Sequence, residues 1–189
     1  MLKLSNISKS FGDKNVLSDF SYDFGEKGIV CISGASGCGK TTLLRIISGL
    51  EKSDNGAILL NGTISFMFQE DRLLNWLSVW ENIACVIPLK KGERKAKAFE
   101  LLDLVGLKGN ENEQISNLSG GMKRRVAFAR AIALEPDILL LDEAFTGLDD
   151  QNRKKLSSLV SEYGKDHLVI MVTHDSEDIE RLADRVIAL

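Results

Sequence analysis

Several short segments of the chain are apolar at almost every position. GIVCIS at 28–33, DILLLD at 137–142 and HLVIMVT at 167–173 are the clearest cases, and RVIAL at 185–189 is a shorter one. Continuous apolar runs of this length are typical of strands that lie in a buried, mostly parallel sheet. The pattern therefore predicts four such strands.

Helical spacing separates these runs. A helix is expected at about 39–49, where Gly49 closes it, another directly after LSGG at 118–121, and a short one after 173. A further helix at about 150–163 has an apolar face made by Leu156, Leu159, Val160 and Tyr163. Strands that alternate with helices predict an α/β fold with a mostly parallel sheet.

Further strands are expected in the first third of the chain. Residues 1–8 and 16–24 predict two short strands around the turn-like SFGDKN, and residues 57–60 and 64–68 predict two more. The second pair is joined at Asn61-Gly62, a dipeptide that favours a tight hairpin turn. We expect an antiparallel β subdomain in this region.

The segment from about 70 to 118 has a helical character. Phe99, Leu102 and Val105 recur at helical spacing, and Gly106 follows them. Because this stretch interrupts the alternation of strands and helices, it predicts an inserted helical subdomain at 70–118. The chain is then one domain, 1–189, whose core is formed by residues 1–69 and 119–189.

Composition narrows the class of protein. The chain has 189 residues, of which 44% are hydrophobic and 27% charged, which suits one globular domain with a proper core. A net charge of −3 argues against a nucleic-acid partner. The apolar runs are too short to cross a bilayer and the N-terminus has no apolar signal segment, so no direct membrane insertion is expected. Three cysteines predict reduced thiols in a cytosolic protein.

GASGCGKT at 34–41 fits the pattern G-x-x-x-x-G-K-[ST] between a strand and a helix. Glycines let successive N–H groups converge on an anion, and the helix N-terminus adds partial positive charge. Lys40 is expected to reach the β- and γ-phosphates of a nucleotide, and the Thr41 hydroxyl to bind Mg²⁺. The alternative is a glycine-rich turn without a ligand. The residues predicted to hold the nucleotide are Gly34, Ala35, Ser36, Gly37, Cys38, Gly39, Lys40, Thr41 and Thr42.

Asp142 and Glu143 follow the apolar run at 138–141. The carboxyl end of a central parallel strand is where α/β sheets bind their ligands. Asp142 is therefore predicted to hold Mg²⁺, and Glu143 to orient or polarise an attacking water. The alternative is an acidic pair that only marks where the chain leaves the sheet for solvent.

LSGGM at 118–122 directly precedes three basic residues, 123–125. Basic residues in the first turn of a helix oppose the helix dipole. We infer a second anion site from the N–H groups of Gly120 and Gly121, the Ser119 hydroxyl and the helix N-terminus. The alternative is a solvated basic helix face after a glycine loop. One nucleotide can use both anion sites only if they come from different places.

LSGGM resembles the signature motif of ABC ATPases, usually LSGGQ. With GASGCGKT and ILLLDEAF it makes essentially the whole chain resemble the ATP-binding subunit of an ABC transporter, with its P-loop NTPase core. The resemblance implies that Gln69 links Mg²⁺ and water to the helical subdomain, and that His174 contacts the γ-phosphate. It also implies that Asp149 lies at a dimer interface and that Phe11 stacks on adenine. Each of these four residues would be unremarkable alone, and their ordered occurrence makes them informative.

Two chains meet head to tail in this family. The resemblance implies that Ser119 and Gly121 bind the γ-phosphate of an ATP held by the opposite chain, which is a second copy or a related ABC ATPase subunit. ATP then closes the dimer, and hydrolysis removes the bridge.

RLLNWLSVWENI at 72–83 resembles the corresponding stretch of nitrate, sulfonate and taurine importers, and Met122 is also typical of that branch. The stretch is expected to face the membrane subunits. Trp76 and Trp80 either form an apolar docking patch there or pack inside the helical subdomain. Asn75 replaces the proline usual in the branch, which leaves the substrate open.

These features predict a subunit that hydrolyses ATP with Mg²⁺ and powers import of a small anion, such as nitrate, a sulfonate or taurine, through integral membrane permease subunits. It is expected at the cytoplasmic face of the membrane. Because the chain ends soon after His174, no appended regulatory domain is expected. The alternative is a soluble ABC-type ATPase of DNA repair or translation. A simple P-loop kinase or GTPase would leave the signature and His174 without a role.

Overall fold

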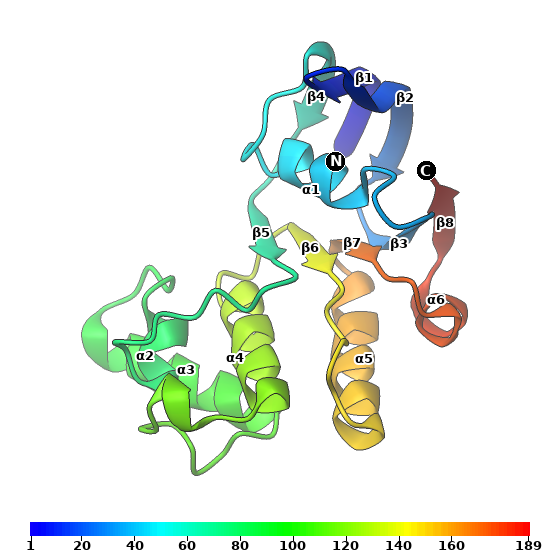
Figure 1. Ribbon diagram of the computed structural model, residues 1–189. Coiled ribbons are helices and arrows are strands. Elements are labelled where there is room, and N and C mark those ends of the chain that lie inside the picture. Colours follow the sequence, from blue (N-terminus) through cyan, green and yellow to red (C-terminus); the bar gives the residue numbers. More distant parts are fainter.

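A parallel sheet of five strands forms the centre of the chain, and an antiparallel sheet of three strands packs against it through a shared apolar cluster (Figure 1). The computed structural model describes residues 1–189. The parallel sheet has the order β5-β6-β7-β3-β8, and the antiparallel sheet has the order β2-β1-β4. The strands are β1 (Leu2–Phe11), β2 (Lys14–Gly25), β3 (Gly28–Ser33), β4 (Asn55–Leu60), β5 (Ile64–Met67), β6 (Ile138–Asp142), β7 (Leu168–Val172) and β8 (Arg185–Ala188).

Six α-helices accompany the two sheets. They are α1 (Lys40–Ile47), α2 (Val79–Ala84), α3 (Lys91–Leu104), α4 (Gly120–Ile132), α5 (Asp150–Gly164) and α6 (Ser176–Leu182), with a 3₁₀ turn at Ile115–Asn117. None of these helices is both long enough and apolar enough to cross a membrane.

Both faces of the central strands are buried, and different elements cover the two faces. Val30 and Ile32 of β3 share a cluster with α1 and the antiparallel sheet, whereas Ile29 and Cys31 share one with α4 and α5. Successive side chains of a strand point to opposite faces of a sheet. The strands are therefore apolar at every position because both faces are covered, and the predicted α/β fold with a mostly parallel sheet is confirmed.

The predicted hairpin at Asn61-Gly62 is wrong. β4 pairs with β1 in the antiparallel sheet, whereas β5 pairs with β6 in the parallel sheet. Gly62 has a φ of +119° and lies so close to Asp137 that an added Cβ would be 2.7 Å from the Cβ of Asp137. The Asp137 carboxylate also accepts a 2.7 Å hydrogen bond from the N–H of Thr63. The dipeptide thus passes the chain from one sheet to the other.

Residues 70–118 contain less helix than the sequence predicts. Loops join α2, α3 and the 3₁₀ turn, and Pro88 lies between the two helices, where it disfavours a continuous one. The buried Asn82 amide donates hydrogen bonds to the carbonyls of Leu74, Leu77 and Ser78. These bonds hold the loop before α2, and the apolar faces of α2 and α3 then join the cluster that includes α4.

Candidate functional site

The loop between β3 and α1 adopts a conformation that only glycine tolerates well. Gly34, Gly37 and Gly39 all have φ between +76° and +148°. At Gly39 an added Cβ would also lie 2.8 Å from a methyl carbon of Val16, and at Gly34 it would lie 2.6 Å from the Leu189 carbonyl oxygen. Conformation and crowding together explain why glycine occupies these positions. The loop ends at the N-terminus of α1, where unpaired N–H groups favour an anion.

Lys40 extends its ammonium group into this loop. Its Nζ donates hydrogen bonds of 2.8 Å to the Gly34 carbonyl and 2.9 Å to the Ala35 carbonyl. Cys38 Sγ lies 3.7 Å from the same Nζ. The Lys40 ammonium group is therefore held against the loop by backbone carbonyls, which phosphate oxygens can replace as its partners.

Thr41 and Asp142 meet at the carboxyl edge of the parallel sheet. The Thr41 hydroxyl donates a 2.8 Å hydrogen bond to Asp142 Oδ2. Asp142 is only 2% exposed, and burial raises its pKa. No cluster of three or more His, Cys, Asp or Glu side chains could hold a metal unaided. The pair instead fits Mg²⁺, which takes one or two protein oxygens together with phosphate oxygens.

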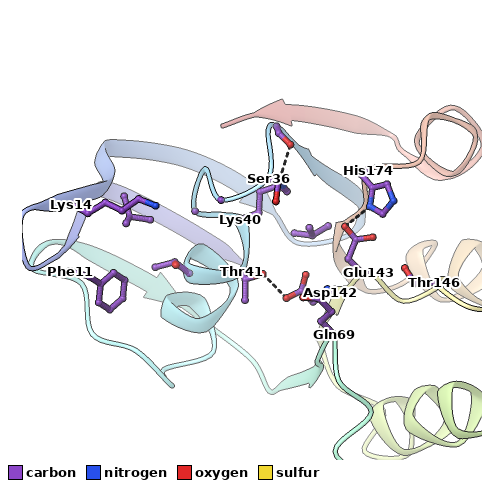
Figure 2. A pocket seen from close by; sticks show the side chains of 16 residues that line it. Phe11, Lys14, Ser36, Lys40, Thr41, Gln69, Asp142, Glu143, Thr146 and His174 are labelled. Atoms are coloured by element: carbon purple, nitrogen blue, oxygen red, sulfur yellow. Dashed lines mark hydrogen bonds and ion pairs between the residues drawn. The ribbon is translucent and has the colours of Figure 1, made fainter. Parts of the chain in front are cut away.

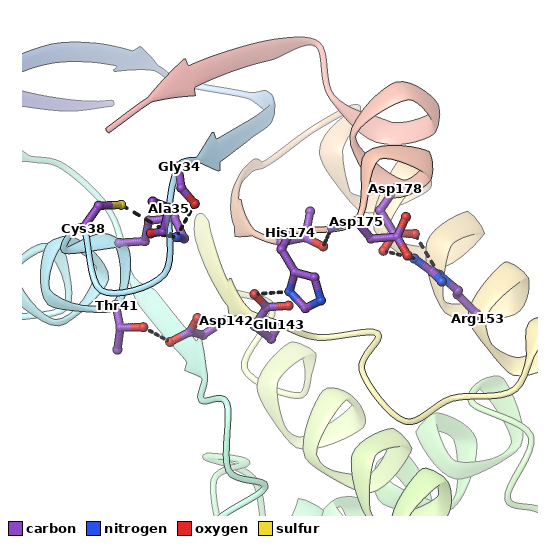
Figure 3. Close-up of polar contacts among 12 residues, drawn as sticks. Gly34, Ala35, Cys38, Thr41, Asp142, Glu143, Arg153, His174, Asp175 and Asp178 are labelled. Carbon is purple, nitrogen blue, oxygen red and sulfur yellow. Dashed lines mark hydrogen bonds and ion pairs between the residues drawn. The ribbon is translucent and has the colours of Figure 1, made fainter.

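Glu143 and His174 form a second pair at the same edge (Figure 3). His174 Nδ1 lies 2.9 Å from Glu143 Oε1, and this hydrogen bond raises the pKa of His174. Glu143 has a φ of +52°, a strained conformation for a residue with a side chain, and its N–H donates to the Val172 carbonyl at 2.9 Å. Glu143 follows β6 and His174 follows the neighbouring strand β7, so the sheet brings the two side chains together.

A cavity of about 580 Å³ joins the two pairs to the loop (Figure 2). Its volume is within the range of small-molecule sites. It brings together most of the residues that the sequence predicts. The predicted residues that line it are Phe11, Gly34, Ser36, Gly37, Gly39, Lys40, Thr41, Thr42, Gln69, Asp142, Glu143 and His174. Ala35 and Cys38 belong to the loop but do not line the cavity.

Four residues that line the cavity were not predicted: Lys14, Val16, Thr146 and Val172. Lys14 and Val16 follow Phe11 in the β1–β2 hairpin, and Figure 2 shows the Lys14 and Phe11 side chains at the same end of the cavity. Val172 ends β7 at the carboxyl edge of the sheet. The position of ligand sites at this edge could have indicated Val172.

Ser119, Gly120 and Gly121 lie outside this cavity. Ser119 caps α4, since its hydroxyl accepts a 3.3 Å hydrogen bond from the N–H of Met122. Asp149 caps α5 and accepts a 2.9 Å hydrogen bond from the N–H of Asn152, which lowers the pKa of Asp149. In Figure 1 both helices begin at the end of the molecule farthest from α1. The second predicted anion site is therefore separate from the first.

Arg124 does not belong to a solvated helix face, and that alternative is wrong. The residue is 4% exposed, and its side chain donates hydrogen bonds to the carbonyls of residues 68–69 and 142–144. Its NH1 also lies 3.1 Å from the Asp71 carboxylate. Arg124 thus joins α4, the segment that carries Gln69 and the segment that carries the acidic pair.

Two further arginines of α4 bind backbone carbonyls. Arg125 is buried and donates to the carbonyls of Val105 and Gly106 at 3.0 and 2.9 Å, and burial lowers its pKa. Arg130 donates to the carbonyls of Asp71 and Arg72, both at 2.9 Å. The sequence pattern of basic residues did not predict these contacts, because their partners lie in distant segments.

The two tryptophans differ in their surroundings. Trp76 is 76% exposed, whereas Trp80 packs against the core and meets Phe99 edge to face at 6.4 Å between ring centroids. Trp80 is partly buried in the helical region, so Trp76 is the more exposed of the two rings.

Comparison with known proteins identifies similar sequences. The model of the ABC transporter family matches residues 17–146. The aliphatic sulfonates import ATP-binding protein SsuB 2 of Burkholderia cenocepacia is 40% identical, over 100% of this chain and 73% of that protein. The sulfate/thiosulfate import ATP-binding protein CysA of Burkholderia mallei is also 40% identical, and the chain spans 59% of its length.

Solved structures are similar over the whole chain. A dimeric structure of a post-hydrolysis state of the ATP-binding cassette MJ0796, bound to ADP and Pi, has a TM-score of 0.92 and 29% identity. The similarity covers 100% of this chain and 94% of that one. A second dimeric structure of MJ0796, described as a bacterial ABC transporter cassette, has a TM-score of 0.90 and 31% identity.

Proposed function

The chain belongs to the ABC transporter family, and from this premise we propose that it is the ATP-hydrolysing subunit of an importer. The loop at 34–42 and Lys40 would hold the β- and γ-phosphates of ATP. Phe11, at the other end of the cavity, would stack on adenine. Mg²⁺, bound to Thr41 and Asp142 with Gln69 nearby, would neutralise charge on the phosphate oxygens.

Glu143 and His174 would act in the hydrolytic step. The Glu143 carboxylate would accept a proton from, or orient, the water that attacks the γ-phosphate. His174, bonded to that carboxylate at 2.9 Å, would contact the γ-phosphate through its other ring nitrogen. The strained backbone at Glu143 supports this role, since strain of this kind is concentrated at functional sites.

The separation of the two anion sites is the observation that carries the proposal for a dimer. Ser119, Gly120 and Gly121 do not line the cavity of their own chain, so a second chain, or a related ABC ATPase subunit, would supply them. Asp149, at the start of the neighbouring helix, would lie at the same interface. The similar cassette MJ0796 is dimeric with ADP and Pi bound, which supports this arrangement.

The partner in the membrane would be an integral permease subunit. We propose that residues 70–118 form a helical subdomain, attached to a core of 1–69 and 119–189, and that this subdomain, with Trp76 exposed on it, contacts the permease at the cytoplasmic face. The names of the relatives refer to sulfate, thiosulfate and aliphatic sulfonates. A small oxyanion of this class, with nitrate and taurine as related candidates, is the proposed cargo.

Nucleotide-dependent dimerisation tests the proposal. Glu143→Gln should stop hydrolysis and trap a dimer with ATP and Mg²⁺, as measured by gel filtration with light scattering. Adding Ser119→Arg should abolish the dimer while ATP binding by the monomer is retained. Adding Ser116→Arg, an exposed position three residues earlier, should leave the dimer intact. A Glu143→Gln chain that stays monomeric at high concentration would refute the composite site.

A further inference from the structure

Arg153 connects α5 to the segment that carries His174. This arginine lies in the first turns of α5, and its guanidinium donates to the carboxylates of Asp175 and Asp178. The Nε–Oδ1 and NH2–Oδ2 distances to Asp178 are 3.0 and 2.7 Å. Figure 3 shows the guanidinium facing both carboxylates, with Asp175 directly beside His174.

The His174 side chain makes few contacts of its own, so its position depends on the backbone segment that carries it. Its side chain is 76% exposed, and its one hydrogen bond is the contact with Glu143. The next residue, Asp175, bonds with both of its carboxylate oxygens: Oδ1 caps the N–H of Glu177 at 2.9 Å, and Oδ2 accepts from Arg153. The bond with Arg153 lowers the pKa of Asp175, so this ion pair persists at neutral pH.

The helix that follows, α6, is too short to be stable without contacts to the rest of the chain. α6 has seven residues, and isolated helices of that length are unstable in water. Asp178 of α6 is 1% exposed, and a buried carboxylate needs charged or hydrogen-bonding partners. Those partners are Arg153, from α5, and Arg181, from α6 itself.

Arg153 is also close to the proposed dimer interface. Its N–H donates a 2.8 Å hydrogen bond to the Asp149 carbonyl, one helical turn away. We infer that Arg153 is a positioning residue that holds residues 173–178 so that His174 stays against Glu143, and that it links this pair to the start of α5. The inference deepens the proposed function and rests on it for the role of His174 in hydrolysis.

The charged groups around His174 are known from the structure. The hydrogen bond with Glu143 is the largest effect and raises the pKa of His174. Asp175 also raises it, and Lys40 lowers it. The pKa of His174 therefore reports whether the ring is beside Glu143.

A double-mutant cycle read by NMR tests the inference in the whole chain without nucleotide. The chain has two histidines, and the NMR signals of His167 are an internal control for those of His174. Glu143→Gln should lower the pKa of His174 when Arg153 is present. In the Arg153→Gln background the same substitution should produce less than about half of that shift, because the two side chains no longer meet.

Arg181→Gln is the matched control. It removes another partner of Asp178 but leaves the hydrogen bonds between Arg153 of α5 and Asp178 of α6. The full effect of Glu143→Gln should persist there. If Arg153→Gln does not fold, Arg153→Lys replaces it, because one ammonium cannot reproduce the fork that meets both carboxylates. An equal pKa shift of His174 with and without Arg153 would overturn the inference.

Turnover separates this inference from the proposed function. Arg153→Gln should lower kcat about tenfold while KM for ATP changes less than about twofold. A wild-type chain that does not hydrolyse ATP would contradict the proposed function and leave the NMR result unaffected.

Discussion

The Thr41 hydroxyl donates a 2.8 Å hydrogen bond to the carboxylate of Asp142, although 101 residues separate the two in sequence. Thr41 lies in the first turn of the helix after the phosphate loop, and Asp142 ends a central strand. Parallel strands present their carboxyl ends at one edge of a sheet, which is why loops from distant parts of the chain meet there. The pair defines the point at which the proposed Mg²⁺ would join protein and phosphate.

Asp142→Asn should separate stability from activity. Burial raises the pKa of Asp142, so the folded chain binds this proton more tightly than the unfolded chain, whose Asp pKa is about 3.9. Between these two pKa values stability falls as pH rises, so the penalty is larger at pH 7 than at pH 4. The variant should therefore melt at a higher temperature at pH 7, by an amount that shrinks toward pH 4. Hydrolysis should fall at least about a hundredfold.

Asp137, at the other end of the same strand, is the control. Hydrogen bonds from the Thr63 N–H and hydroxyl lower its pKa, so its charge favours folding above pH 4 and this contribution is lost as pH falls. Asp137→Asn should lower the melting temperature at pH 7 and leave hydrolysis unchanged. Opposite signs for the two variants are expected in thermal melts followed by circular dichroism, and equal signs would contradict the argument.

Arg124→Ala should destabilise the chain by about 3–5 kcal/mol, the typical effect of removing one partner from a buried charged network. The substitution leaves the carbonyls at 68–69 and 142–144 without their donor. Urea denaturation measures the free energy of unfolding.

Lys123→Ala provides the comparison, because Lys123 has the same charge in the same helical turn but is more exposed. Its effect should stay within about 0.5 kcal/mol, as is usual for surface positions. Similar losses for the two variants would contradict the argument that the carbonyl contacts of Arg124 cause the loss.

Alkylation should distinguish the three free thiols. Cys38 lies in the phosphate loop, Cys85 is exposed elsewhere, and Cys31 is buried, where its pKa is raised to about 12. A maleimide should label Cys38 and Cys85 but not Cys31, and labelling of Cys38 should block ATP binding. Nucleotide at 100 times its Kd leaves about 1% of the sites free, so Cys38 labelling should slow by a comparable factor.

Cys85 is the reference for this measurement, since it does not line the cavity. Peptide mass spectrometry gives both labelling rates from one sample. Equal protection of Cys38 and Cys85 by ATP would indicate a general change in the chain, and no protection of Cys38 would place the nucleotide elsewhere.

The apolar runs and motifs predicted the α/β fold. Together with the family resemblance, which implied Phe11, Gln69 and His174, they also predicted twelve residues that line one cavity. The failures concern long-range pairing. Asn61-Gly62 favours a hairpin locally, but β4 and β5 each find a better partner in a different sheet. Local turn preference is worth little against the hydrogen bonds that pair each strand with its neighbour in the sheet.

Arg124 and Arg153 show the same limit. Their sequence neighbours indicate only a helix with basic residues, whereas their partners lie 18 to 56 residues away for Arg124 and 22 to 25 for Arg153. By itself the sequence determined the strands, the glycine loop and the order of the motifs, because these depend on backbone conformation and spacing within a few residues. Only the tertiary structure decided which carbonyls and carboxylates the arginines bind, because a buried guanidinium takes its partners from whatever segments the folded core brings within reach.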